Sequence, residues 1–213
     1  SAASDVYKRQ ADPDYIHDIY EGPNGVKLNF YYKNDPKIID NWKAVQPVTA
    51  ELMEFFNENI GVYPYKQYSV VQGGDGGMEY SMLTLVNYGN EFVPLVSVTS
   101  HELAHAWFQG VLATNEMNHE WMDEGAASFF GDLAESFVLG SNFINSIRSS
   151  YASYIRLANS GQEMPQSTNA NRYKFNRAYE STAYSKGFVF LSQLRYIIGP
   201  VSYTHLRAHE TNS

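Results

Sequence analysis

The feature that most constrains this chain is the pentapeptide His101-Glu102-Leu103-Ala104-His105, followed after eighteen intervening residues by Glu124. On a helix, positions i and i+4 lie on the same face, so the two imidazoles can bind one metal ion. Glu102 lies about 100° around such a helix, where its carboxylate can reach a water molecule at the metal. Two histidines and one carboxylate leave a fourth zinc position open, as in catalytic sites. The pattern therefore predicts a catalytic zinc site.

The residues around the motif decide between this interpretation and a chance match. Three fixed positions in five residues do arise by chance, and two helical histidines can be ordinary surface or core residues. However, apolar residues across 96–109 predict a largely buried helix. Burial of two imidazoles and a carboxylate without partners would be costly, and a metal would be such a partner. A second predicted helix begins at Glu124 and has an apolar side over 125–139, so two packed helices could bring the three ligands together.

Composition excludes several other classes of protein. The chain has no cysteine, which excludes disulfides and a cysteine-ligated structural zinc, so any zinc ligand must be His or a carboxylate. The net charge is −8 and no Lys/Arg cluster is present, which disfavours a nucleic acid partner. No run of apolar residues is long enough for a membrane span. A cationic amino terminus would suit this charge better as a ligand.

Both ends of the chain look foreign to the domain. Residues 1–10 and 201–213 resemble translated read-through from sequencing adapters, and we predict that they are non-native extensions. This excludes His205, His209 and Glu210 as ligands. The remaining residues, 11–200, are predicted to be a partial catalytic domain that holds the zinc site and begins with a short strand region.

The order of the predicted elements indicates the fold class. The predicted elements are a turn at 22–25, a strand at 26–32, a helix at 47–60 capped by Thr49, strands at 68–72 and 78–87 around a glycine-rich segment, the two zinc helices, a helix after Ser141, a loop at 159–172 and a helix at 182–198. Strands first and helices afterwards predict an α+β fold. A zinc helix beside a glycine-rich strand edge is typical of thermolysin-like metalloproteases.

Three segments together resemble the aminopeptidase N family. They are the zinc motif with Glu124 at this gap, Gly76-Gly77-Met78-Glu79-Tyr80, and Tyr184-Ser185-Lys186-Gly187. The resemblance covers nearly all of 26–199. It is closest to the version found in bacterial secreted or cell-envelope members, although a cytoplasmic location stays open.

The resemblance implies a role for each matching residue. It implies that His101, His105 and Glu124 bind one Zn²⁺ per chain and that Glu102 is the general base. Glu79 would hold the α-amino group of a peptide substrate, and Gly76, Gly77 and Met78 would belong to the same substrate site. Tyr184 would donate its hydroxyl to the oxyanion of the tetrahedral intermediate. The implied activity is hydrolysis of the N-terminal residue from peptides with a free N-terminus.

Alternatives remain for the function and for single residues. The chain could be a thermolysin-type endopeptidase, an epoxide hydrolase of the leukotriene type, or a degenerate scaffold for protein interactions. Tyr80 stands where the family more often has asparagine, and the family's flanking domains are missing. Tyr179 competes with Tyr184. Asp123 could orient an imidazole or could simply be an acid at a helix start. His119 and Glu120 are predicted to lie in a loop without a metal role.

Overall fold

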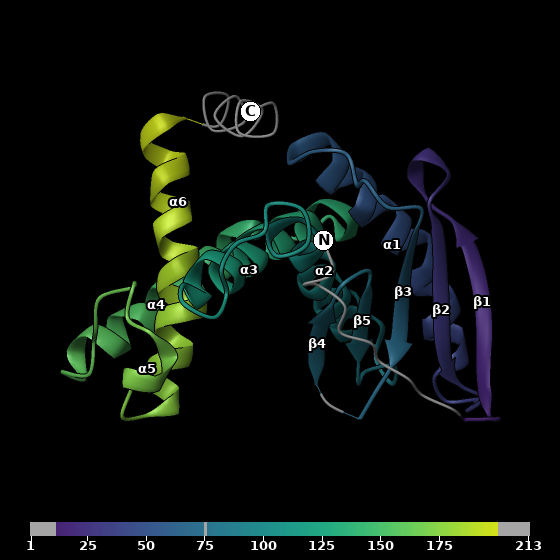
Figure 1. Cartoon of the computed structure of the whole chain (residues 1–213), viewed down its shortest axis with the longest axis horizontal. Helices are drawn as coiled ribbons and strands as arrows, with labels where there is room; N and C mark the ends of the chain where they lie inside the picture. Colours follow the sequence, from purple (N-terminus) through teal and green to yellow (C-terminus); the bar gives the residue numbers. More distant parts are fainter. Residues whose placement is uncertain (1–11, 75, 200–213) are drawn as a thin grey trace.

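The computed structural model describes residues 12–74 and 76–199. A mixed sheet lies at one side of the molecule and a group of helices at the other, with helix α2 (Phe92–Phe108) between them (Figure 1). This arrangement confirms the predicted α+β fold. The terminal segments predicted to be foreign, 1–10 and 201–213, fall outside the described residues.

The sheet has five strands in the order β1-β2-β3-β5-β4. The strands are β1 (Tyr15–Glu21), β2 (Lys27–Lys33), β3 (Gln67–Gln72), β4 (Gly77–Tyr80) and β5 (Leu83–Val86). β2, β3 and β5 are parallel to one another, whereas β1 and β4 are antiparallel edge strands. The single strand predicted at 78–87 is wrong, because Met82 has a φ of 59° and the chain turns back there as a hairpin. This turn makes β4 an edge.

Helix α1 (Ile39–Asn59) packs on the sheet and begins earlier than the sequence predicted. The predicted start at Pro47 is wrong, because this proline lies inside the helix. The apolar face extends upstream of the proline, because Trp42 and Val45 are completely buried. Thr49 is not an N-cap, since its hydroxyl donates back to the carbonyl of Val45 at 2.8 Å.

Helix α3 (Glu120–Leu139) lies against α2 and also begins earlier than predicted. Glu124 therefore sits in the second turn of a formed helix instead of starting one. The prediction that Glu120 lies in a loop was wrong, because it is the first residue of α3 and His119 is its N-cap. A side chain at Gly131 would meet the backbone of His101 at about 3.0 Å, so this glycine allows the two helices to approach closely.

The last third of the chain is helical but more interrupted than expected. Helix α4 (Phe143–Asn159) is capped by Asn142 rather than Ser141, since the Asn142 side chain accepts from the Ile144 amide at 3.0 Å. A 3-10 turn, η3 (Ala170–Arg172), interrupts the predicted loop. The single helix predicted at 182–198 is divided into a π-helical turn η4 (Ser181–Lys186) and α6 (Gly187–Ile198), and a short helix α5 (Asn176–Glu180) precedes them.

Gly125 in α3 and Gly187 at the start of α6 allow these two helices to pack closely. An added side chain at Gly125 in α3 would meet Gly187 Cα at 2.7 Å, and one at Gly187 would meet Gly125 Cα at 2.8 Å. Backbone therefore packs directly on backbone where α3 crosses the start of α6, which leaves no room for any other residue type. This crossing places the segment before Gly187 beside Glu124.

One hydrophobic core runs from the sheet to α6. It includes Leu28, Phe30 and Tyr32 of β2, whose alternation was predicted, and it continues through Trp107 to Phe129 and Phe188. Aromatic rings touch along this path, with ring centroids 5.0 Å apart for Phe56 and Trp107 and 5.2 Å apart for Phe129 and Phe188. Across residues 12–74 and 76–199, no helix combines the length and apolar character that a bilayer crossing requires.

Candidate metal centre

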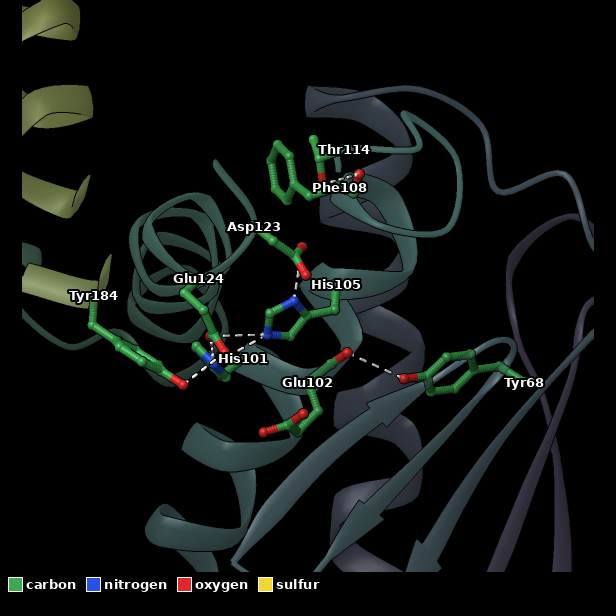
Figure 2. Close-up of polar contacts among 9 residues, drawn as sticks. All are labelled: Tyr68, His101, Glu102, His105, Phe108, Thr114, Asp123, Glu124 and Tyr184. Carbon is green, nitrogen blue, oxygen red and sulfur yellow. Dashed lines mark hydrogen bonds and ion pairs between the residues drawn. The ribbon is translucent and has the colours of Figure 1, made fainter. Parts of the chain in front are cut away.

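Three side chains from α2 and α3 point toward one another in the middle of the molecule (Figure 2). The Nε2 atoms of His101 and His105 are 3.2 Å apart, and Glu124 Oε2 lies 3.3 Å from the first and 3.4 Å from the second. The three atoms thus form a nearly equilateral triangle. The structure brings together the three residues that the sequence predicted as ligands.

The size of this triangle fits a zinc ion. Bonds of about 2.0–2.1 Å in a tetrahedral site place neighbouring ligand atoms about 3.3–3.4 Å apart. Glu124 Oε2 is buried and has no hydrogen-bond partner within the described residues. A buried oxygen without a donor, facing two imidazole nitrogens, is costly unless a cation lies among them. The donor set, its spacing and its missing partner therefore fit the metal predicted from the sequence.

Asp123 controls the orientation of His105. Asp123 Oδ1 approaches His105 Nδ1 to 2.9 Å, although the pair is poorly aligned for a straight hydrogen bond, and both side chains are about 1% exposed. The carboxylate favours the proton on Nδ1, so the lone pair of the neutral ring is on Nε2 and faces the triangle. Of the two interpretations of Asp123 left open above, this contact supports orientation of an imidazole.

The electrostatics of the centre favour a positive charge at its middle. Burial alone would lower the pKa of His105, but the carboxylates of Asp123 and Glu124 raise it well above its usual value. Burial would likewise raise the pKa of Glu124, but His101 and His105 hold it far below its usual value. A proton on His105 can supply the positive charge, and a divalent metal would displace that proton.

Glu102 lies beside the triangle in a space that Gly77 makes possible. A side chain on Gly77 would overlap the carboxylate of Glu102, so glycine lets this carboxylate lie against β4 in its present position. Glu102 Oε2 is buried and has no hydrogen-bond partner within the described residues. Burial raises the pKa of Glu102 to about 7, while the neighbouring His105 opposes this increase. A carboxylate with a pKa near neutral suits proton transfer.

Glu79 brings a second carboxylate to the same place. One oxygen of Glu79, one of Glu102 and one nitrogen of His105 all lie within 4.8 Å of one another. Burial raises the pKa of Glu79 to about 7 as well. Glu79 is on the edge strand β4, next to Met78, whose side chain is partly exposed. Gly76 lies before the strand, and its carbonyl already accepts from the Asn87 amide at 2.9 Å.

Tyr184 reaches the centre from η4 (Figure 2). Its hydroxyl donates to Glu124 Oε1 at 2.6 Å, and its ring stacks on His101 with centroids 6.0 Å apart. Burial raises the pKa of this hydroxyl, and the charge of Glu124 raises it further, so the phenol stays protonated and remains a donor. Its competitor Tyr179 packs against the ring of Tyr173. Burial and the charges of Glu120 and Glu124 raise the pKa of Tyr179, so this residue also lies near the centre.

Sequence reasoning missed one carboxylate of the site, Glu116. Its oxygen lies within 4.8 Å of oxygens of Glu79 and Asp123. Burial raises its pKa, and the neighbouring Asp123 raises it further. Glu116 lies in the connection between α2 and α3, where no helical or strand spacing relates it to the other ligands. Glu120, in contrast, accepts from the Ala170 amide at 3.0 Å and serves the fold.

Comparisons with known proteins identify the family of this chain. The sequence pattern of the peptidase family M1 domain matches residues 46–208. The chain is 26% identical over 157 residues to leucine aminopeptidase 2 of Vanderwaltozyma polyspora, a match that covers 66% of this chain and 21% of that protein. It is 26% identical over 182 residues to human aminopeptidase B, covering 78% of this chain and 27% of the relative. The chain thus spans about a quarter of the length of these relatives.

A solved structure has the same fold. The crystal structure of an M1 zinc metallopeptidase from Deinococcus radiodurans superposes with a TM-score of 0.65 at 21% identity, covering 92% of this chain and 43% of that one. At this identity the likeness shows the fold alone. The family pattern, however, covers most of the chain, including both metal helices and Tyr184. The chain therefore belongs to peptidase family M1.

Proposed function

We propose that this chain is the catalytic part of a zinc aminopeptidase, which hydrolyses the first peptide bond of substrates with a free amino terminus. The observation that carries the proposal is the place of Glu79. Its carboxylate lies within 4.8 Å of both Glu102 and His105 atoms, where it can pair with a substrate ammonium group beside the reacting bond. An anchored amino terminus limits cleavage to the end of a peptide.

His101, His105 and Glu124 would hold the zinc. When bound, zinc would polarise the scissile carbonyl and make water acidic enough to lose a proton near neutral pH. Asp123 would keep His105 in the tautomer that offers Nε2 to the metal. These roles follow from the donor atoms that face the triangle and, for His105, from the Asp123 carboxylate beside its outer nitrogen.

Glu102 would act as the general base. It would take a proton from the attacking water and later deliver it to the leaving amine, for which its pKa of about 7 is suited. Tyr184 would turn its protonated hydroxyl from Glu124 to the oxyanion that develops on the carbonyl oxygen. A donor of this kind contributes a factor of about 10² to 10³ in turnover.

The edge strand β4 would bind the peptide backbone. Because β4 is the last strand of the sheet, one side of its backbone has no strand partner within the described residues. An extended peptide can pair with such an edge. Gly77 would serve this role and also make room for Glu102, whereas the carbonyl of Gly76 is already bonded to Asn87.

The test compares one short peptide with a free and with an acetylated amino terminus, using the zinc-loaded chain. We expect release of the first residue from the free peptide and a rate about 10- to 100-fold lower for the acetylated one, because a charged hydrogen bond contributes about 1.5–3 kcal/mol. Glu79→Gln should reduce this preference by raising KM for the free peptide. Equal rates for both peptides would contradict the proposal and favour an endopeptidase. A chain that binds zinc but cleaves neither peptide would favour a scaffold.

A further inference from the structure

A cavity of about 310 Å³ lies away from the metal centre, between α4, the loop that follows it, α5 and the first residue of η4. In Figure 1 these elements form the end of the molecule farthest from β1. The cavity is at the lower end of the range of about 300–1,000 Å³ typical of small-molecule sites. Its polar lining consists of Ser153, Arg156, Ser160, Gln162, Arg177 and Ser181.

Among the described residues, the charged ones that line this cavity are two arginines, Arg156 and Arg177. Neither Arg156 nor Arg177 forms an ion pair with any residue of the described chain. Both arginines are exposed residues. Two unpaired guanidinium groups at one cavity create a positive potential that favours an anion.

The nearby acids do not cancel this charge. The carboxylate of Glu163 is bound by Lys186 Nζ at 2.7 Å and by the Tyr154 hydroxyl at 3.1 Å. Glu180 follows Arg177 by three residues, yet the two form no ion pair in the described structure. The positive charge of the cavity is therefore not neutralised by the protein itself.

The cavity also offers neutral donors. The carbonyl of Leu157, at the negative end of α4, is occupied because it accepts from the Ser160 amide at 3.0 Å and from its hydroxyl at 2.6 Å. The side chains of Ser153, Gln162 and Ser181 make no hydrogen bond within residues 12–74 and 76–199. Hydroxyl and amide groups can thus add hydrogen bonds to an anion held by the arginines.

We propose that this cavity binds a phosphate group, either inorganic phosphate or a small phosphate monoester. A phosphate carries about −1.5 to −2 charges at pH 7 and three acceptor oxygens, which match two guanidinium groups and several hydroxyls. A single carboxylate has one charge and would leave one arginine without a counter-ion. Arginine forms paired hydrogen bonds with phosphate oxygens, which suits this choice of residue.

Calorimetric titration of the metal-free chain tests the proposal. The probes are inorganic phosphate, phenyl phosphate and acetate, each at an ionic strength held constant with chloride. We expect one phosphate or phenyl phosphate per chain and at least tenfold weaker binding of acetate. Arg156→Ala and Arg177→Ala should each weaken phosphate about tenfold, and the double variant about a hundredfold. Preference between the two phosphates identifies the source of the ligand.

The matched control is Arg148→Ala. Arg148 is an exposed arginine on the same helix, α4, and it does not line the cavity. Its loss should leave the affinity unchanged, and circular dichroism should show that all variants are folded. Absence of phosphate binding, binding unchanged in the double variant, or an equal loss in Arg148→Ala would each overturn the proposal. These readouts do not depend on zinc or on peptidase activity.

Discussion

Two polar clusters in this molecule, one partly buried beside the sheet and one at the metal centre, differ in how their hydrogen bonds are completed. In the sheet cluster, formed by Asp18, Tyr32 and Gln46, the Asp18 carboxylate accepts from the Tyr32 hydroxyl and from the Gln46 amide at 2.9 Å. The metal cluster is formed by His101, Glu102, His105, Asp123 and Glu124, and its carboxylates outnumber its donors. Three of its carboxylates have a buried oxygen without a hydrogen-bond donor among the described residues.

The polar groups of the sheet cluster stabilise the fold, whereas those of the metal cluster are arranged to bind a ligand. A buried acceptor that has its donors contributes modestly to stability, whereas one without a donor costs about 1–3 kcal/mol. The sheet cluster is complete by itself. The buried acceptors of the metal cluster are satisfied only when a cation is bound. The free-energy cost of burying them without one is offset by the packing of α2 and α3 around them. Incomplete buried groups at one point are thus a structural sign of function.

The largest expected effect is that of Glu102→Gln. It should lower kcat/KM for a free peptide by about 10² to 10⁴, the usual range for loss of a general base. The melting temperature should stay equal or increase, because a buried carboxylate without a donor is removed. The control is Glu135→Gln on α3, another carboxylate whose pKa is raised by burial but which lies outside the metal cluster. Full activity in Glu102→Gln would remove Glu102 from the mechanism.

Asp123→Asn should have an intermediate effect, and it should act on the metal. The variant should bind zinc about 10- to 100-fold more weakly, because loss of a group that orients a ligand typically has this cost. Competition with a chromophoric chelator measures the affinity. Chelation of the metal should also lower the melting temperature of the wild-type chain, since a ligand that binds only the folded state stabilises it. An unchanged zinc affinity would show that Asp123 merely fills space at the start of α3.

Tyr32→Phe should have the smallest effect, and it should act on stability alone. Loss of the hydrogen bond to Asp18 should lower the free energy of unfolding by about 1–3 kcal/mol without changing zinc affinity. The Tyr32 hydroxyl holds the pKa of Asp18 below its usual value. The bond therefore contributes above about pH 4, and its contribution is lost as pH falls through the lowered pKa. Urea unfolding at pH 7 and pH 3 should show a difference that shrinks in acid; a constant difference would contradict this account.

The helical part of the site could be predicted because it depends on local spacing. His101 and His105 lie one turn apart on any helix, so their common direction follows from the sequence alone. The ends of the helices and strands were less predictable. Pro47 indicated a helix start, yet the burial of Trp42 and Val45 extends α1 upstream of it. Met82 adopts a positive φ that its residue type does not suggest, so the hairpin that makes β4 an edge was missed.

Residues far apart in sequence could be related only through the resemblance to a family. Nothing in the spacing of Tyr184 or Glu79 places either beside the histidines. The backbone contact between Gly125 and Gly187 brings Tyr184 to Glu124, and the lack of a side chain at Gly77 allows Glu102 to lie against β4. No pattern in the sequence indicates that Glu116 belongs to the site, because its position depends on the path of the connection between α2 and α3.

The sequence by itself determined the kind of chemistry, because ligand types and their helical spacing are local properties that survive in any fold containing that helix. The tertiary structure alone decided which carboxylates are buried without donors. It therefore decided which of them have raised pKa values and which can bind a cation. It also decided that the polar groups of Asp18 and Tyr32 are mutually satisfied and serve the fold. The physical reason is that desolvation and hydrogen-bond completion depend on neighbours from distant segments, which only packing brings together.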